Sequence, residues 1–184
     1  MGQDARIRYT KMVIQTNFIS LLKEKPLNKI TVKEICALAE INRATLYKYY
    51  ADAYDLMDKI EDALLKELQE TVQHSLKDGI NKTLVQILEK MKENGQLYMT
   101  LFSKNGDPLF PMKIFQMCYN ETASHINRQF PKLPNHQKTW MYLYAAQGSC
   151  GILNYWISSE MEQSPEEVAG FIEDLIESTL HGIS

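Results

Sequence analysis

The chain has 184 residues, 45% of them hydrophobic and 23% charged, which is close to the average of soluble globular proteins. No apolar run is long enough to span a bilayer, and the three cysteines lie too far apart for a disulfide-dense scaffold. The four histidines show no metal-ligand spacing with one another or with a cysteine. The sequence therefore indicates neither a membrane span nor a metal site, and we expect no cofactor.

The net charge of −3 is distributed unevenly along the chain. Residues 1–51 hold nine Lys or Arg against four Asp or Glu, a net of +5, and residues 52–184 hold eleven against nineteen, a net of −8. A basic first part followed by an acidic second part indicates that the first part meets a polyanion. We expect two domains, 1–51 and 52–184.

Helical periodicity dominates the sequence, and strand patterns are nearly absent. Ile7, Ile14, Phe18 and Leu21 form one apolar stripe in a first helix that ends at Pro26. The pattern predicts eight further helices and an all-α fold with nine helices in total. These eight are expected near 31–38, 42–49, 52–77, 81–93, 96–103, 107–130, 134–158 and 164–182.

Short polar signals mark where several of these helices begin. Thr31 and Glu34 have the spacing of a capping box, and Asn42 is suited to be the N-cap of the third helix. Asp52 can cap the fourth helix. The stretch "SPEE" at 164–167 places Ser at the N-cap, Pro at the first helical position and Glu three residues after the cap.

The second and third helices, with the tight turn "AEIN" between them, have the length and spacing of a helix-turn-helix, whose second helix enters the DNA major groove. Leu46 and Tyr50 fall nearly on one face, which is expected to pack inward with Ile35, Leu38 and Ile41. The opposite side carries hydrogen-bond donors and aromatic rings that suit phosphates and base edges: Ala44, Thr45, Lys48 and Tyr49, flanked by Arg43 and Tyr47.

The stretch "ITVKEICALAEINRATLYKYYADAYDLM" resembles the DNA-binding head of the TetR (tetracycline-repressor) family of bacterial regulators, and the similarity covers about residues 7–60. The resemblance implies that Tyr47 and Lys48 hold phosphates and that Lys33, Arg43 and Thr45 lie nearest to bases. Tyr49 is expected to serve either purpose. The whole set expected to face DNA is Thr31, Lys33, Asn42, Arg43, Ala44, Thr45, Tyr47, Lys48 and Tyr49.

Two positions depart from the family pattern. Glu40 stands where the family usually has Gly in the turn. Either a residue other than Gly adopts positive φ there at a modest cost, or the turn differs slightly. Ala53 stands where a Lys usually begins the fourth helix, which removes one expected phosphate contact. The loss of one such contact lowers the salt dependence of DNA binding by about one unit of slope.

The acidic second part resembles the effector-binding and dimerisation body of such a regulator. "SKNGDPLF" at 103–110 and "GILNYWISSEMEQSPEEVAGFIEDL" at 151–175 look like a subtype that also occurs in regulators and coactivators of dihydroxyacetone kinase operons. Candidates for an effector pocket are Tyr98, Phe102, Met117, Trp140 and Tyr144. The resemblance implies a dimer interface on the last two helices, with Gly148, Gly151, Tyr155, Trp156 and Phe171 as its residues.

The sequence thus predicts a homodimeric repressor in the bacterial cytoplasm that binds a palindromic operator in double-stranded DNA and is released by a small-molecule effector. A second interpretation is a coactivator that is switched by a partner protein instead of a metabolite. An enzyme is not expected, because the sequence shows no nucleophile–base pair, no paired carboxylates in an apolar run and no phosphate loop.

Overall fold

A computed structural model describes the backbone of residues 2–129 and 131–181 and the side chains of residues 4–121 and 131–179. Within these ranges the chain forms nine α-helices and two short 3₁₀-helices, and no strand. This confirms the all-α prediction. In the described ranges no helix combines the length and the apolar character needed to cross a bilayer.

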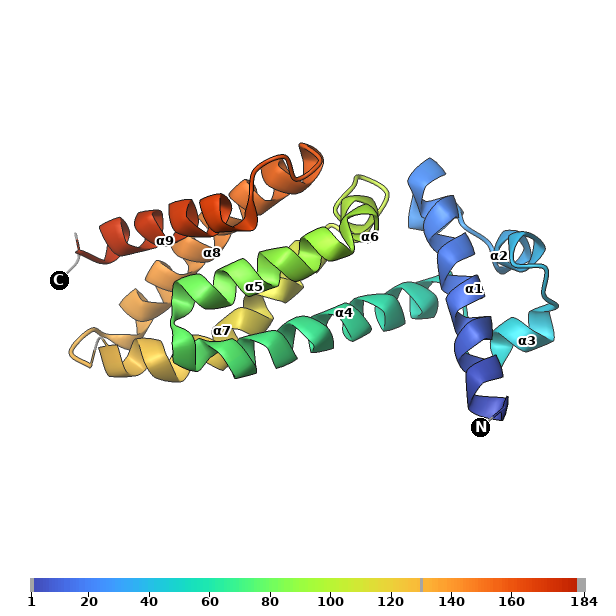
Figure 1. Cartoon of the computed structure of the whole chain (residues 1–184), viewed down its shortest axis with the longest axis horizontal. Helices are drawn as coiled ribbons and strands as arrows, with labels where there is room; N and C mark the ends of the chain where they lie inside the picture. The colour runs from blue at the N-terminus through green and yellow to red at the C-terminus, as the bar shows by residue number, and fades with distance from the viewer. Residues whose placement is uncertain (1, 130, 182–184) are drawn as a thin grey trace. The chain divides into compact units, whose positions relative to one another are not determined.

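The chain divides into two compact units, which we call the head and the body. The head comprises residues 1–64 together with residues 100–108, and the body comprises residues 65–99 and 109–184. This division differs from the expected boundary at residue 51, because the first turns of the fourth helix and a segment from the middle of the chain belong to the head. Figure 1 shows the helices with their labels.

The head begins with α1 (Gly2–Glu24), after which Pro26 opens the turn that carries the short helix η1 (Leu27–Lys29). Two short helices follow, α2 (Val32–Leu38) and α3 (Arg43–Tyr47). α2 packs against both α1 and α3. The centre of the head is apolar, with the side chains of Ile14, Phe18, Leu22, Ile35 and Leu46 fully buried.

The body contains the second half of α4 (Ala53–Ser75) and most of the helices that follow it. Gly79 separates α4 and the short 3₁₀-helix after it from the next α-helix. Its φ of 110° is a backbone conformation that residues other than glycine rarely adopt. The remaining elements are η2 (Leu76–Asp78), α5 (Ile80–Glu93), α6 (Gly95–Leu101), α7 (Phe110–Gln129), α8 (Asn135–Ser158) and α9 (Pro165–His181). The last two residues of α6 already belong to the head.

Three helix pairs make the main contacts of the body: α5 with α9, α7 with α8, and α8 with α9. α5 and α9 run side by side in Figure 1. The observed bounds follow the predicted ones within three residues, and the expected ends at residues 130 and 182 lie outside the described residues. α7 begins later than expected, at Phe110, which places Pro111 in its first turn, where its missing N–H costs no hydrogen bond.

Candidate DNA-binding face and dimer surface

The start of α2 is held by the predicted capping box. The backbone N–H of Glu34 donates to Thr31 Oγ1 at 3.3 Å, and the backbone N–H of Thr31 donates to Glu34 Oε2 at 3.0 Å. Lys25 Nζ also reaches Glu34 Oε1 at 2.5 Å. The hydrogen bond from Lys25, followed by those from the Thr31 side chain and backbone, lowers the pKa of Glu34 to about 2. This network fixes the entry of the helix-turn-helix.

The turn between α2 and α3 contains a positive φ, the first of the two alternatives for Glu40. Glu40 adopts φ 52° in the left-handed region, where a non-glycine residue carries a conformational cost. The turn closes because the backbone N–H of Ile41 donates to the carbonyl oxygen of Cys36 at 3.0 Å. The side chain of Glu40 is exposed beside the residues that start α3.

Asn42 caps α3 as predicted, and it also orients a neighbouring side chain. Its Oδ1 accepts from the backbone N–H of Thr45 at 2.8 Å and from the Thr45 hydroxyl at 3.0 Å. The Thr45 hydroxyl hydrogen is therefore engaged within the head, and only its oxygen lone pairs can serve an outside partner. Arg43 and Ala44 lie exposed in the same first turn.

α3 is anchored on its apolar side by Leu46 and Tyr50, which are 0% and 3% exposed. The outward side carries Tyr47, Lys48 and the half-buried Tyr49. The prediction was wrong for Leu38, whose side chain is 51% exposed. The buried face of α2 runs through Ile35 and its neighbours Cys36 and Ala39, and Leu38 falls outside that sector of the helix.

The first turns of α4 secure the end of α3. Lys59 Nζ donates to the carbonyl oxygen of Tyr49 at 2.8 Å and pairs with Asp55 Oδ2 at 2.8 Å. Asp52 caps α4 as predicted, since its Oδ1 accepts from the backbone N–H of Asp55 at 2.9 Å. Ala53 is buried, at 4% exposure. Lys59 was not among the predicted site residues, and its contact across the turn leaves no signal in the sequence.

The cations of the head fall into two groups. Lys25 and Lys59 are paired with carboxylates inside the head. Lys33, Arg43 and Lys48 are exposed and form no salt bridge with any described residue. The cations on α2 and α3 that were expected to face DNA are thus among those left without a carboxylate. An outward row of this kind suits a phosphate backbone.

The structure places the five side chains expected to form an effector pocket on different elements and at different degrees of burial. Tyr98 is 2% exposed and stacks on Phe110 with ring centroids 6.5 Å apart. Phe102 follows the end of α6 and belongs to the head, and Met117 is half-buried on α7. Trp140 and Tyr144 are 63% and 70% exposed on α8.

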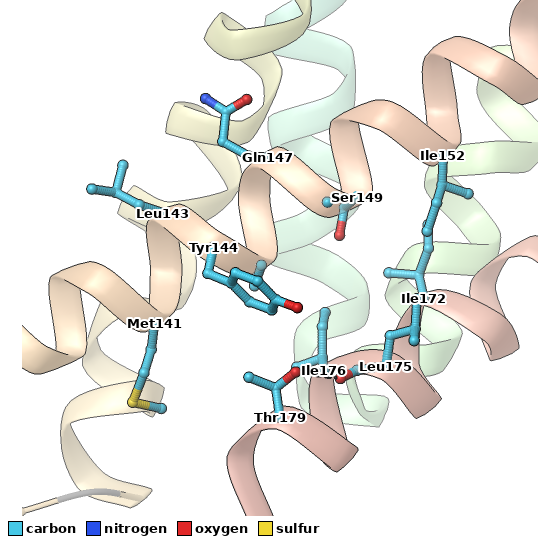
Figure 2. Close-up of a pocket in the computed structure, with 12 residues that line it drawn as sticks. Met141, Leu143, Tyr144, Gln147, Ser149, Ile152, Ile172, Leu175, Ile176 and Thr179 are labelled. Atoms are coloured by element: carbon cyan, nitrogen blue, oxygen red, sulfur yellow. Dashed lines mark hydrogen bonds between the residues drawn. The ribbon is translucent and has the colours of Figure 1, made fainter. Parts of the chain in front are cut away.

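An apolar groove of about 510 Å³ lies between α8 and α9. In Figure 2 the ring of Tyr144 reaches from α8 toward the side chains of Ile176 and Thr179 on α9. Large apolar side chains are exposed on these two helices. Leu143, Tyr144 and Leu175 line the groove, and Trp140, Tyr155 and Phe171 lie on the same helices, all six between 46% and 70% exposed. A set of exposed apolar side chains on two adjacent helices is typical of a protein-interaction surface.

Four of the five residues expected at a dimer interface lie on this surface. Gly148 and Gly151 are exposed, and an added Cβ would meet nothing within 4 Å at either position. Tyr155 and Phe171 are 70% and 57% exposed. Trp156 differs, because it is 1% exposed and its indole N–H donates to the carbonyl oxygen of Gln163 at 3.1 Å. Trp156 therefore belongs to the core of the body.

A helix-turn-helix head followed by a helical body is the architecture of a DNA-binding transcriptional regulator. Residues 78–178 match the TetR C-terminal family model described as "Transcriptional regulator C-terminal region". The chain belongs to the TetR family of transcriptional regulators, as the resemblance of the head implies.

Known relatives agree with this assignment. The chain is 24% identical over 170 residues to the HTH-type transcriptional regulator YxbF of Bacillus subtilis (strain 168), covering 89% of this chain and 43% of that protein. The chain thus spans less than half the length of this curated relative. A TetR transcriptional regulator from Streptococcus agalactiae 2603V has the same fold, with a TM-score of 0.70, 23% identity and coverage of 95% and 97% of the two chains. The structure of the dihydroxyacetone kinase operon activator DhaS is also similar, with a TM-score of 0.62, 22% identity and coverage of 92% of this chain and 95% of that chain.

Proposed function

We propose that the chain is a sequence-specific repressor that binds a palindromic operator as a homodimer and is released by a small-molecule effector. The observation that carries the DNA-binding part is the arrangement of α3. Leu46 and Tyr50 hold its apolar side in the head, while Arg43, Ala44 and Lys48 are exposed on the outside. A helix presented in this way, with cations outward, suits the major groove.

Within this proposal the exposed residues have different tasks. Arg43, Ala44 and Thr45 occupy the first turn of α3, where side chains approach base edges, and Lys33 assists from α2. Tyr47, Lys48 and Tyr49 follow and bind phosphates, as do the Thr31 and Asn42 ends of the two helices. The side chains of Thr31 and Asn42 also hold the first turns of α2 and α3 in place.

Selection of bound sites from a random duplex pool at moderate salt tests this part. We expect a palindrome with half-site centres about 34 Å apart or a multiple of that spacing. Arg43→Ala is expected to weaken binding by about 1–3 kcal/mol and relax base preference, whereas Lys48→Ala weakens binding on all sequences alike. Lys77→Ala, an exposed cation of the body, serves as the charge-matched control. Enrichment of no sequence at all would contradict the proposal.

The α8–α9 surface supports the dimer. A single short recognition helix contacts few base pairs, and two heads on one palindrome double the contact. Phe171→Glu places a charge at an exposed apolar position of α9 and is expected to shift the mass measured by analytical ultracentrifugation toward the monomer. Tyr9→Glu, at a similarly exposed aromatic residue on α1, is the matched control and is expected to leave the mass unchanged. Equal masses for both variants would place the interface elsewhere.

Release by an effector is the third part of the proposal, and membership of the TetR family, whose C-terminal model matches residues 78–178, supports it. A reporter gene with the selected operator across its promoter tests the sign of regulation. We expect expression to fall when the protein is present and to recover with a ligand that raises the melting temperature of the purified protein. Expression that rises with the protein would show an activator instead.

A further inference from the structure

One face of α1 lies against the end of the recognition helix. The ammonium of Lys11 stands 5.6 Å from the centroid of the Tyr49 ring, a cation–π contact. One turn further along α1, Gln15 Nε2 donates to the Tyr50 hydroxyl at 3.4 Å. These two contacts place the face of α1 that carries Lys11 and Gln15 directly beside the residues that follow α3.

Helical geometry extends this face toward the start of α1. Successive residues differ by about 100°, so Arg8, Lys11 and Gln15 lie within a sector of about 60°. Arg8 is therefore on the same face, about 4.5 Å further along the helix axis and one turn beyond the contact with Tyr49. Arg6 points about 160° away from Arg8 and lies on the other flank of the helix.

Arg8 and Lys11 are both exposed, and neither forms a salt bridge with a described residue. They share this property with Lys48, which is next to Tyr49 in the chain. Asp4 lies on the same sector of α1 one turn beyond Arg8, and its opposite charge ends the row. The exposed cations at the end of α3 and those on this face of α1 therefore lie on either side of the Tyr49 ring.

We propose that Arg8 and Lys11 form an additional phosphate-binding row, which contacts the DNA backbone beside the major groove that α3 enters. This inference rests on the proposed function. Arg8 binds a phosphate through its guanidinium, and Lys11 binds a phosphate while its stem and ammonium hold the Tyr49 ring in place. Contacts of this kind fix the orientation of the head on the duplex and carry no base specificity.

The test is the salt dependence of duplex binding by the full chain. We expect Arg8→Ala to reduce the slope of log K against log salt by about 0.9 and to lower affinity near physiological salt about threefold to tenfold. The factor is expected to be the same on the selected operator and on a scrambled duplex. Arg6→Ala removes the same charge from the opposite flank of the same helix and is expected to keep the slope of the unaltered protein.

Lys11 provides a second, independent measurement. Lys11→Arg keeps the charge and is expected to keep the slope, whereas Lys11→Met is expected to lower it as Arg8→Ala does. Both positions are exposed, so a melting temperature equal to that of the unaltered protein verifies that each variant is folded.

Failure of this inference can be told apart from failure of the proposed function. If Lys48→Ala lowers the slope while Arg8→Ala behaves as Arg6→Ala, the row on α1 does not bind phosphates and the proposed function stands. If the unaltered protein binds no duplex even at low salt, both are overturned. A reduced slope for Arg8→Ala on the selected operator but not on scrambled duplex would also overturn a pure backbone contact.

Discussion

The side-chain amide of Asn105 donates to the carbonyl oxygen of Leu22 at 3.0 Å, across 83 positions of the sequence. The same side-chain amide also donates to the carbonyl oxygen of Lys23 at 3.4 Å. The backbone carbonyl oxygen of Asn105 accepts from the backbone N–H of Leu27 at 3.3 Å. The last carbonyl groups of a helix lack partners within the helix. Asn105 supplies these partners for α1 and ties the segment 100–108 to the head.

Asn105→Ala is expected to destabilise the protein by about 1–3 kcal/mol, because a buried carbonyl group loses its donor. For a chain of this size the melting temperature falls by about 2–4 °C per kcal/mol. Asn105→Asp is expected to be at least as harmful, since a carboxylate presents oxygen atoms to carbonyl oxygen atoms. Lys104→Ala, at the exposed neighbouring position, is the control and should change stability by less than about 0.5 kcal/mol. Equal melting temperatures for all three variants would contradict this role of Asn105.

Gly106 follows Asn105 at a position where the backbone leaves no room for a side chain. A Cβ built there would stand 2.0 Å from the carbonyl oxygen of Leu101. Gly106→Ala is therefore expected to destabilise the protein by at least about 3 kcal/mol in chemical denaturation. Gly95→Ala is the comparison, because the nearest atom to its added methyl group, Met161 Sδ, is at an ordinary 3.5 Å. A tolerated alanine at position 106 would mean that the turn relaxes readily.

Glu40 combines a strained backbone with a negative charge beside α3. Replacing it by Gly relieves a cost of about 1 kcal/mol but enlarges the entropy of the unfolded chain by a similar amount. We expect Glu40→Gly to change stability by less than about 1 kcal/mol. Both Glu40→Gly and Glu40→Gln are expected to strengthen duplex binding, since each removes a charge that repels phosphates. Tighter binding by the Gly variant alone would assign the effect to the backbone instead.

The Lys25–Glu34–Thr31 network predicts a pH dependence in acid. The pKa of Glu34 is lowered to about 2, so the folded protein binds this proton more weakly than the unfolded chain does. The contribution of Glu34 to stability is complete above the ordinary pKa of 4.5 and is lost as the pH falls through about 2. The difference in urea midpoint between the unaltered protein and Glu34→Gln should be constant above about pH 5 and shrink below it. A difference that is independent of pH down to 2 would contradict the assignment.

Two substitutions of Asn42 are expected to affect stability and DNA binding differently. Asn42→Ala removes the acceptor for Thr45 and is expected to cost about 1 kcal/mol of stability. Asn42→Asp keeps that acceptor and is expected to keep stability, because a carboxylate at a helix N-terminus is favourable. The Asp variant should nevertheless bind duplex DNA more weakly, since its charge faces phosphates. Thermal melts and duplex titrations of the two variants check both statements.

The features that the sequence predicted well depend on neighbours within a few positions. The caps at Thr31, Asn42 and Asp52 involve residues three positions away, and the local backbone decides whether they form. The positive φ of Glu40 is one of the two alternatives that followed from the Gly of the family pattern at this position. The burial of Leu46 and Tyr50 follows from helical periodicity, which a short stretch of sequence displays in full.

Features that depend on distant residues could not be predicted. Leu38 lies at the edge of an apolar face, and the neighbouring elements decide which edge residues are covered. The motif "SKNGDPLF" was associated with the body, yet residues 103–108 belong to the head because Asn105 bonds to α1. The contact of Lys11 with Tyr49 likewise joins residues 38 positions apart, and no periodicity within α1 reveals it.

The head is assembled from two stretches of chain, residues 1–64 and residues 100–108, so the polypeptide passes between the two units three times. A chimera made by joining a foreign head at Leu65 would place a foreign α1 against the resident Asn105. Modular exchange of DNA specificity therefore requires that nine residues from the middle of the chain be carried along with the first 64. Recombination at a single point between the genes of two regulators with this arrangement would combine α1 of one protein with the segment 100–108 of the other. The two stretches therefore need to be inherited together.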